Sequence, residues 1–504
     1  MFCNTEGKAN LNVYLLNIYL EEIMQIEETS LTKNIYANIK LIKEQLHDSP
    51  ELLVRLINLD PYQNYCALLF IDGLANTQVI RESIIEPLLE IRKIDKESLM
   101  DTIAIRYIRS ESVEEVTSIS SIIDGIVRGK TLVLVDGFDS VLLVDTTEWQ
   151  KRAVEQSTKQ RNFQGTLISF TEELKVNLNI LHNMIPSPIL KVEKKQIGRI
   201  VKTEIAIVYL TDFVDETVLE EVRQRIDSLE VNYVMESRII EEAIEGDQKT
   251  IFPLSFNSEI PDAVSAALYE GRIAVFTNGT PTASIVPNLF IQYFQEPNEY
   301  NTKEKYAKRI LTFLCFFITI LSPGSYLTLI YHHKNWVPPK IQDEFFQHML
   351  LPYWLEIFIT LIFFQILGFS SYRISKEMIL LASLVSTITL GSIAVEAKVI
   401  HPLSLIVVGI CYLTSTILTI GKLPDSIITL RYVFLFLGLL FGITGLCIGV
   451  IILIIHLSRL RSVGVPYLAP IIPFNYKEFK DVFYRGDLRK LTNSPHKYPH
   501  DDKQ

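Results

Sequence analysis

The feature that most constrains this chain is a set of long apolar stretches in its C-terminal part. Between about residues 310 and 457 several runs of about twenty residues carry almost no charge. Twenty apolar residues in a helix can cross a hydrocarbon layer about 30 Å thick. The sequence therefore predicts an α-helical polytopic membrane domain over residues 308–457. Its expected apolar segments lie at about 310–331, 350–370, 377–396, 402–421 and 431–457.

The part before residue 308 mixes charged and apolar residues in the proportions of a globular protein. The formal net charge of the chain is −10, and an acidic balance argues against a nucleic-acid partner. The opening sequence, MFCNTEGKANLNVYLLNIYLEEIMQ, lacks the basic start of a signal peptide, and Glu21 and Glu22 end its apolar stretch. We expect the N-terminal region to lie in the cytoplasm.

This N-terminal region contains an internal duplication. The same order of an apolar strand, a turn and an amphipathic helix is expected in two stretches, CALLFIDGLANTQVIRESIIEPL and AIVYLTDFVDETVLEEVRQRIDSL. Aligning them pairs Ala75 with Val214 at an offset of 139. GKTLVLVDGFDSVLLVD matches GRIAVFTNGTPTASIVP at an offset of 142, and each pattern is typical of a β-hairpin. We therefore expect two repeated α/β subdomains, at residues 50–152 and 200–297.

The remaining segments are assigned from composition and helical periodicity. We expect a helical N-terminal appendage over residues 1–48, a linker with one helix over 153–199, and a basic cytoplasmic tail over 458–504. The Asp-Gly pairs that begin at Asp72 and Asp136 are interpreted as turns, since glycine supplies the positive φ that a tight turn needs.

Catalytic motifs are missing from the sequence. It contains no HExxH, P-loop or GxSxG pattern, and no GxGxxG after a strand, so we do not expect an enzyme. The five cysteines are scattered, without CxxC spacing or a histidine at ligand spacing. No metal or other cofactor is predicted.

The number of crossings follows from the basic flanks. Lysines and arginines lie before the first apolar segment and after the last, which places both flanks in the cytoplasm and favours an even number of crossings. One of the five segments should then be re-entrant or interfacial. The first segment, interrupted by Pro323 and Gly324, and the segment at 350–370 are the two candidates.

Other residues inside the apolar segments have more than one interpretation. Four glycines fall at helical spacing on one face of the expected last helix, which suits close helix packing, a subunit contact or a pore lining. They are Gly438, Gly442, Gly445 and Gly449. Glu356 and Glu396 are either functional acids within the membrane or interfacial side chains.

Three stretches give the chain a family resemblance. LSRLRSVGVPYLAP resembles the signature that follows the last span in A subunits of the GerA family of spore germination receptors. The stretch IPDAVSAALYEGRIAVFTNGTPTASIVPNLFIQYFQEPNEY and the span HPLSLIVVGICYLTS resemble further parts of that family, with Asn278-Gly279 in place of the usual Asp-Gly. Together they cover roughly residues 150–475.

The resemblance implies a function and partners. Such an A subunit lies in the inner membrane of dormant spores with a transporter-like B subunit and a lipoprotein C subunit. The complex senses nutrients and triggers ion release, and the A subunit is expected to form a homo-oligomer and to form or gate the ion pathway. Two alternatives are a membrane scaffold without conduction and a secondary transporter for small solutes.

The loop after the last span suggests how a signal could be coupled to the membrane. We expect Arg459 and Arg461 to anchor the cytoplasmic end of the last helix. A fixed non-helical turn would then direct the tail back towards the cytoplasmic subdomains. Its residues are Gly464, Pro466, Pro470 and Pro473. A rigid stop-transfer loop without a role in signalling is the alternative.

Overall fold

The computed structural model of this chain forms two compact units. The first contains residues 1–214, 227–240 and 258–285, and the second contains residues 215–226, 241–257 and 286–504. The structure describes residues 30–59, 65–91, 99–147, 168–294, 305–339, 342, 350–370, 391–418 and 423–474. The expected segment 377–396, up to residue 390, and most of the expected tail lie outside the described residues.

The first repeat alternates helices and strands. Its elements are α2 (Ile35–Gln45), β1 (Leu52–Asn58), β2 (Tyr65–Ile71), α3 (Thr77–Val79), η1 (Ile80–Ile85), α4 (Glu86–Leu89), α5 (Leu99–Thr102), η3 (Ile103–Tyr107), β3 (Val113–Val116), α6 (Ile119–Val127), β4 (Thr131–Val135) and β5 (Val141–Val144).

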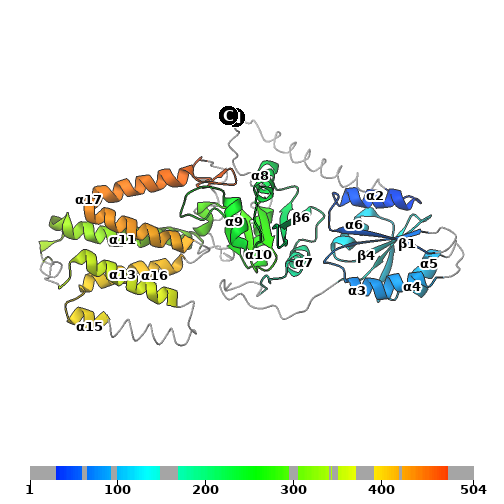
Figure 1. Ribbon diagram of the computed structural model, residues 1–504, viewed down its shortest axis with the longest axis horizontal. Helices are drawn as coiled ribbons and strands as arrows, with labels where there is room; N and C mark the ends of the chain where they lie inside the picture. The colour runs from blue at the N-terminus through cyan, green and yellow to red at the C-terminus, as the bar shows by residue number, and fades with distance from the viewer. Residues whose placement is uncertain are drawn as a thin grey trace, which may run out of the picture. The chain divides into compact units, whose positions relative to one another are not determined.

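The first sheet is the middle layer between two layers of helices. Its strand order is β1-β2-β4-β5-β3, with antiparallel neighbours. Alternate residues of β2 enter different cores: Leu68 lies with η1 and α4, whereas Leu69 lies with α2 and α6. Figure 1 shows α2 and α6 on one side of this sheet and α3 and α4 on the other.

The second repeat has the same topology. Its elements are α7 (Leu174–Met184), β6 (Leu190–Ile197), β7 (Thr203–Leu210), α8 (Glu216–Asp227), α9 (Ser237–Glu245), β8 (Phe256–Ser258), α10 (Pro261–Tyr269), β9 (Ile273–Thr277) and β10 (Ala283–Val286). The sheet order β6-β7-β9-β10-β8 matches that of the first sheet strand for strand. The predicted duplication is thus present in the fold.

One buried asparagine holds the first helix of each repeat. In the first repeat, Asn38 Oδ1 accepts from the Thr32 amide (2.8 Å) and Asn38 Nδ2 donates to the Thr32 carbonyl (2.6 Å). In the second, Asn177 makes the same two bonds with Thr171, at 2.7 and 2.6 Å. The offset between these residues is again 139, so the duplication includes this helix.

The turn residues of the predicted hairpins also hold these helices. Asp136 Oδ1 accepts from the Ile35 amide at 3.2 Å, and Asn278 Oδ1 accepts from the Leu174 amide at 3.1 Å. Each side chain thereby satisfies an amide at a helix start that has no partner within the helix. Asp136 is therefore more than a turn former, because it connects the hairpin to α2.

These contacts move two of the expected boundaries. Helix α2, expected within an appendage at 1–48, lies in the core of the first repeat, where Ile35 and Ile42 are buried beside α6. Helix α7 and strand β6, expected within a linker at 153–199, belong to the second repeat. The polar residues at these helix starts resemble a solvated linker in sequence, although Asn38 and Asn177 are buried.

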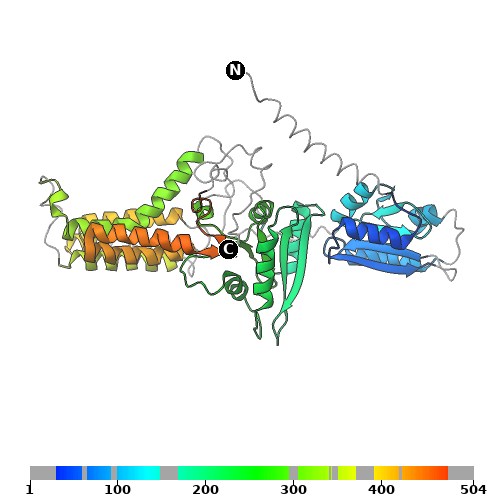
Figure 2. The same cartoon turned by 90° about the horizontal axis from the view of Figure 1, so that it is seen from above.

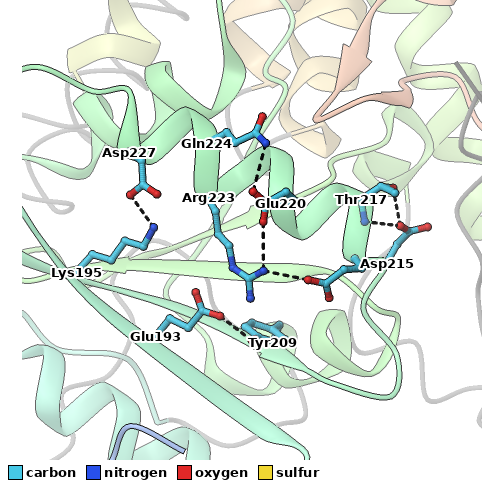
Figure 3. Close-up of polar contacts among 10 residues, drawn as sticks. Glu193, Lys195, Tyr209, Asp215, Thr217, Glu220, Arg223, Gln224 and Asp227 are labelled. Carbon is cyan, nitrogen blue, oxygen red and sulfur yellow. Dashed lines mark hydrogen bonds and ion pairs between the residues drawn. The ribbon is translucent and has the colours of Figure 1, made fainter.

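The second helical segment of each repeat begins with equivalent caps. Asn76 Oδ1 accepts from the Gln78 amide at 2.9 Å, and Asp215 Oδ1 accepts from the Thr217 amide at 2.9 Å. Figure 3 shows the Asp215 cap and the side chains that follow it on α8. Short polar side chains are favoured at such N-cap positions because their oxygen reaches the free amides of the first turn.

The second unit carries the apolar helices. They are α11 (Lys305–Tyr331), α13 (Tyr353–Ser370), α15 (Gly391–Glu396), α16 (Pro402–Ile417) and α17 (Leu423–Arg459), with 3₁₀ turns η4 (Phe290–Phe294) and η5 (Lys334–Trp336) and the short strands β11 (Arg461–Ser462) and β12 (Val465–Pro466). Among the described residues, α11 from Arg309 and α17 are long and apolar enough to cross a membrane, and α13 and α16 are shorter apolar helices. A polytopic domain remains a prediction.

Helix α17 reverses direction at its middle. Gly442 has φ 60° and ψ −143°, which no helix contains. A Cβ on Gly449 would meet the Phe434 side chain at 2.9 Å, a contact that a straight helix cannot make across fifteen residues. Figure 1 shows two arms that meet at the α17 label, and Figure 2 shows α17 beside the other apolar helices of this unit. The expected last span is therefore a helical hairpin.

The first apolar helix, by contrast, is continuous. Pro323 lies inside α11 without ending it, so the expectation of a broken first span was wrong. A reversal of the chain lies at Gly442, and whether one of the first two segments is re-entrant or interfacial stays a prediction. One core cluster contains Phe316, in the first half of α11, together with Leu423 and Leu457 near the two ends of α17. The chain thus enters and leaves this group of helices at the same end.

Candidate functional site: a joint at the end of the last helix

A tight hairpin follows α17. Strands β11 and β12 pair Arg461 with Pro466 and Ser462 with Val465. The two residues between them have positive φ, 47° at Val463 and 78° at Gly464. A two-residue turn of this kind suits glycine, which has no Cβ to clash. The predicted non-helical turn is present, with Pro466 and Pro470 buried and Pro473 exposed.

Aromatic side chains hold this hairpin against two earlier segments of the same unit. Tyr467 is fully buried, and its ring lies 6.4 Å from that of Phe252 and 6.0 Å from that of Phe290. The Phe290 amide also donates to the Tyr467 carbonyl at 2.9 Å. We call the three packed segments, residues 248–254, 286–294 and 460–470, the joint.

A polar network inside the joint centres on Asn288, which is fully buried. Its amide donates to Ser462 Oγ at 2.8 Å, and its Nδ2 donates to the Pro253 carbonyl and to the Tyr293 hydroxyl. Ser462 Oγ in turn donates to the Leu254 carbonyl at 2.6 Å. One asparagine and one serine thus connect all three segments.

Segment 248–254 also bonds to both arms of α17. Gln248 accepts from the Arg461 amide at 3.1 Å and donates to the Arg461 carbonyl at 2.6 Å. Thr250 shares a hydrogen bond with His456 on the second arm (3.1 Å), and Ser426 on the first arm donates to the Ile251 carbonyl. A displacement of this segment would therefore act on both arms.

The tyrosines of the joint stay protonated over a wide pH range. Burial raises the pKa of Tyr467 and of Tyr293 above the ordinary tyrosine value, and the nearby Glu245 carboxylate raises both further. The Tyr467 hydroxyl is buried without a hydrogen-bond partner. Glu245 Oε1 accepts from the Ser255 amide and hydroxyl, so this acid is held by the segment beside the joint.

Both predicted anchor arginines lie at this end of α17. Arg459 and Arg461 are exposed, and the Arg461 guanidinium donates to the Gly464 carbonyl at 3.2 Å across the hairpin turn. Their position suits an interfacial anchor. Their anchoring role stays a prediction.

Within the apolar helices, Pro323 leaves one carbonyl of α11 without its usual partner. Proline has no amide hydrogen, so the Thr319 carbonyl one turn earlier loses its intrahelical donor. The Cys411 thiol on α16 donates to that oxygen at 3.2 Å. The freed carbonyl therefore has a hydrogen-bond partner, supplied by a neighbouring helix.

The four glycines allow close contact, but not along one face of one helix. A Cβ on Gly438 would lie 2.4 Å from the Gly324 carbonyl oxygen of α11. Gly445 and Gly449 face the first arm of α17, where a Cβ on Gly445 would lie 2.5 Å from the Leu437 carbonyl oxygen. The expectation of a single face was wrong, because the chain reverses at Gly442. All four glycines are buried.

The two acids that had the same interpretation in the sequence have different environments. Glu356 is fully buried and accepts from the His401 amide (3.0 Å) and from the Ser404 hydroxyl, whose oxygen lies 3.2 Å from the Tyr326 hydroxyl oxygen. It therefore connects α13 to the start of α16. Glu396 is exposed at the end of α15.

Sequence reasoning missed several residues of the joint and one residue of α17. Gln248 and Asn288 lie in segments whose sequence is typical of ordinary polar loops. Their role becomes visible only in the structure, where each forms a hydrogen bond with the hairpin after α17. Arg431 is a charged residue within an apolar run, and the sequence analysis took it as the flank of a span that begins at 431.

Within the described part of the chain, no group of three or more His, Cys, Asp or Glu residues could hold a metal ion.

Comparison with known proteins decides the family. Over residues 40–497 the chain matches the family described as Bacillus/Clostridium GerA spore germination protein. This chain belongs to the GerA family. It is 30% identical over 461 residues to Spore germination protein KA of Bacillus subtilis (strain 168), covering 90% of this chain and 85% of that protein. The resemblance carried by the three sequence stretches is confirmed.

Other GerA family members are similar over most of their length. Spore germination protein GerLA of Bacillus cereus is 25% identical over 475 residues, covering 92% of this chain and 96% of that protein. The crystal structure of the N-terminal domain of the A subunit of the Bacillus megaterium spore germinant receptor GerK3 matches with a TM-score of 0.40 at 27% identity. It covers 52% of this chain and 98% of that one.

Proposed function

We propose that this chain is the A subunit of a nutrient germinant receptor in the spore inner membrane. Membership of the GerA family over residues 40–497 supports this, and so do relatives named as spore germination proteins. The receptor contains a transporter-like B subunit and a lipoprotein C subunit, and the A subunit forms a homo-oligomer within the membrane lipids. It transduces nutrient sensing into germination and is not an enzyme.

The observation that carries the mechanism is the joint. Segment 248–254 bonds to both arms of α17 and to the hairpin that follows α17. A nutrient signal that displaces this segment therefore moves both arms together, and we propose that this movement forms or gates an ion pathway lined by the apolar helices. The alternative of a broken-span transporter loses its main support, because α11 is continuous through Pro323.

We propose an orientation in the membrane that the same geometry supports. The first half of α11 and both ends of α17 share one core cluster, and exposed Arg459 and Arg461 lie at that end. Because arginines near short apolar helices favour the cytoplasmic side, this end faces the cytoplasm. The N-terminal repeats are then cytoplasmic, and an even number of crossings returns the tail to the same side.

Two experiments test this function. Deletion of the gene in the spore-forming host should abolish germination in response to one class of nutrient while sporulation stays normal, and the intact gene should restore it. Purified protein reconstituted in liposomes should conduct monovalent cations if the A subunit itself forms the pathway. If the gene restores germination but the purified protein does not conduct, the A subunit acts as a scaffold without an ion pathway of its own. If deletion leaves the nutrient response unchanged in a strain without related receptors, the proposal is contradicted.

A further inference from the structure

The first arm of α17 crosses α11 where two buried glycines face each other. A Cβ on Gly324 would lie 2.4 Å from the Phe434 carbonyl oxygen, and a Cβ on Gly438 would lie 2.4 Å from the Gly324 carbonyl oxygen. The Thr328 hydroxyl of α11, also buried, donates to the Gly438 carbonyl at 3.2 Å. Because backbones this close leave no room for a side chain, the crossing fixes the two helices to each other.

One side chain at the end of α11 holds the reversal of α17 just beyond this crossing. In a continuous helix the Leu439 carbonyl would accept from the Ile443 amide, but the non-helical dihedral angles of Gly442 turn that amide away. His332, which follows the last residue of α11, donates instead, and its Nε2 lies 2.8 Å from the Leu439 carbonyl oxygen. A Cβ on Gly442 would meet the same ring at 2.9 Å, so the imidazole packs directly against the reversal.

These two contacts between α11 and α17 differ in their access to water. The groups at the crossing are buried, whereas the His332 side chain is exposed. Breaking a buried contact leaves polar groups without partners, but water can replace the partner of an exposed group. The attachment at the reversal therefore opens more easily than the crossing does.

The crossing lies between the joint and the reversal along the first arm of α17. Ser426 bonds to the Ile251 carbonyl in the joint, and from Ser426 to Gly438 the arm spans about 18 Å, against about 6 Å from Gly438 to Gly442. A helix that tilts about a fixed crossing moves its two ends in opposite directions. A displacement of about 3 Å at the joint then moves the reversal by about 1 Å, which takes the 2.8 Å bond of His332 beyond hydrogen-bond length.

We propose that His332 is a latch that opposes the tilt of α17, and that this latch opens when the receptor responds to a nutrient. The proposal rests on the proposed function, in which a displacement of the joint moves both arms of α17 together. Because the tilt must break the bond between His332 and the Leu439 carbonyl, the bond stabilises the untilted form. Its removal makes the tilt easier without a change to any residue of the joint.

The test compares spores that carry four forms of the chain at equal amount in the inner membrane. Against the wild type, His332→Ala removes the donor and should lower the nutrient concentration for half-maximal germination about fivefold, the effect of one net hydrogen bond on an equilibrium. His332→Gln keeps a donor nitrogen on a side chain of similar length and should restore the wild-type concentration. His333→Ala is the control, because this neighbouring ring stacks on Trp336 instead (centroids 4.6 Å apart), and it should respond as the wild type does.

Hydrogen exchange of the same four purified full-length proteins in detergent gives the second measurement. His332→Ala should accelerate exchange at residues 440–446 about fivefold and leave the amides around Gly324 unchanged, since local opening sets the exchange rate. The other two variants should exchange as the wild type does. A change confined to the reversal would show that the variant has kept its fold.

The direction of the germination change decides the proposal. A chain that was merely destabilised would need more nutrient, so a lower requirement identifies a latch. The proposal is overturned if His332→Ala spores need as much nutrient as the wild type or more, or if His332→Gln shifts the requirement as far as His332→Ala does. Failure of the wild-type gene to restore any nutrient response to the deletion strain would contradict the proposed function instead, which keeps the two failures distinct.

Discussion

The two repeats hold their first helix by the same bonds but differ after their last strand pair. Thr146 and Asn288 occupy equivalent positions, separated by the same 142 residues as Asp136 and Asn278. Thr146 stays within its own sheet, sharing a hydrogen bond with Thr131 at 2.7 Å. Asn288 instead donates to the hairpin that follows the last helix. The same fold thus occurs twice, and in the second copy the residue after the last strand bonds to the hairpin that follows α17.

The largest effect should come from breaking that attachment. Asn288→Ala removes two side-chain donors and leaves the Tyr293 hydroxyl and the Pro253 carbonyl buried without them, a loss of about 3 kcal/mol. Hydrogen exchange in the purified full-length protein should show faster exchange throughout the joint. The equivalent change Thr146→Val is the control, and it should accelerate exchange only in the first sheet. Equal exchange changes in the joint for both variants would remove the distinction between the repeats.

A second pair of changes tests what the repeats share. Asn38→Ala and Asn177→Ala each delete both bonds to a neighbouring threonine, at an expected loss of about 2 kcal/mol. Exchange should accelerate in α2 for the first variant and in α7 for the second, to a similar extent. A large difference between the two helices would mean that the shared bonds do not carry similar energies.

The hairpin residues that hold these helices should have smaller and again matched effects. Asp136→Ala and Asn278→Ala each free one amide at a helix start, which costs about 1 kcal/mol. Protease cleavage near Ile35 and Leu174 is the measurement. Cleavage at one site alone would show that the two hairpins support their helices unequally.

The smallest effect should come from an exposed ion pair in the second repeat. Lys195 and Asp227 lie 2.6 Å apart (Figure 3), yet the Asp227 side chain is 62% exposed. Exposed pairs contribute between zero and about 1 kcal/mol. Lys195→Ala should therefore leave exchange in the second sheet within about 0.5 kcal/mol of the wild type. A larger change would show that this sheet depends on charges that have no counterpart in the first.

Sequence analysis predicted the elements with strong periodicity and missed those defined by distant contacts. The duplication, the two β-hairpins and the turn at Gly464 followed from spacing and glycine chemistry, and the structure contains all three. The boundary before α2 was misplaced because a buried Asn38 reads as a polar linker residue. The reversal at Gly442 was missed because the apolar run continues through it, and hydrophobicity alone carries no signal for a change of direction.

The candidate site was predicted only in part. The arginines and prolines after the last helix pointed to the hairpin, but the residues that bond to it lie more than 170 positions earlier in the chain. Gln248, Asn288 and Ser462 carry no local pattern that distinguishes them from ordinary loop residues. Their role follows from a pairing of distant segments, which one sequence does not contain.

The central claim is that the joint transmits the nutrient signal to the last helix. Ser462→Ala tests it most directly, because this change removes the two bonds of one buried hydroxyl with almost no change in volume. Spores that carry the variant are compared with the wild type at equal receptor amount in the inner membrane. Ser458→Ala, which affects a half-buried serine bonded within α17, is the control.

The account predicts that Ser462→Ala spores need about tenfold more nutrient for half-maximal germination, while Ser458→Ala spores respond as the wild type does. Equal nutrient sensitivity in all three strains would contradict a signalling role for the joint and leave it as a rigid connection after the last helix.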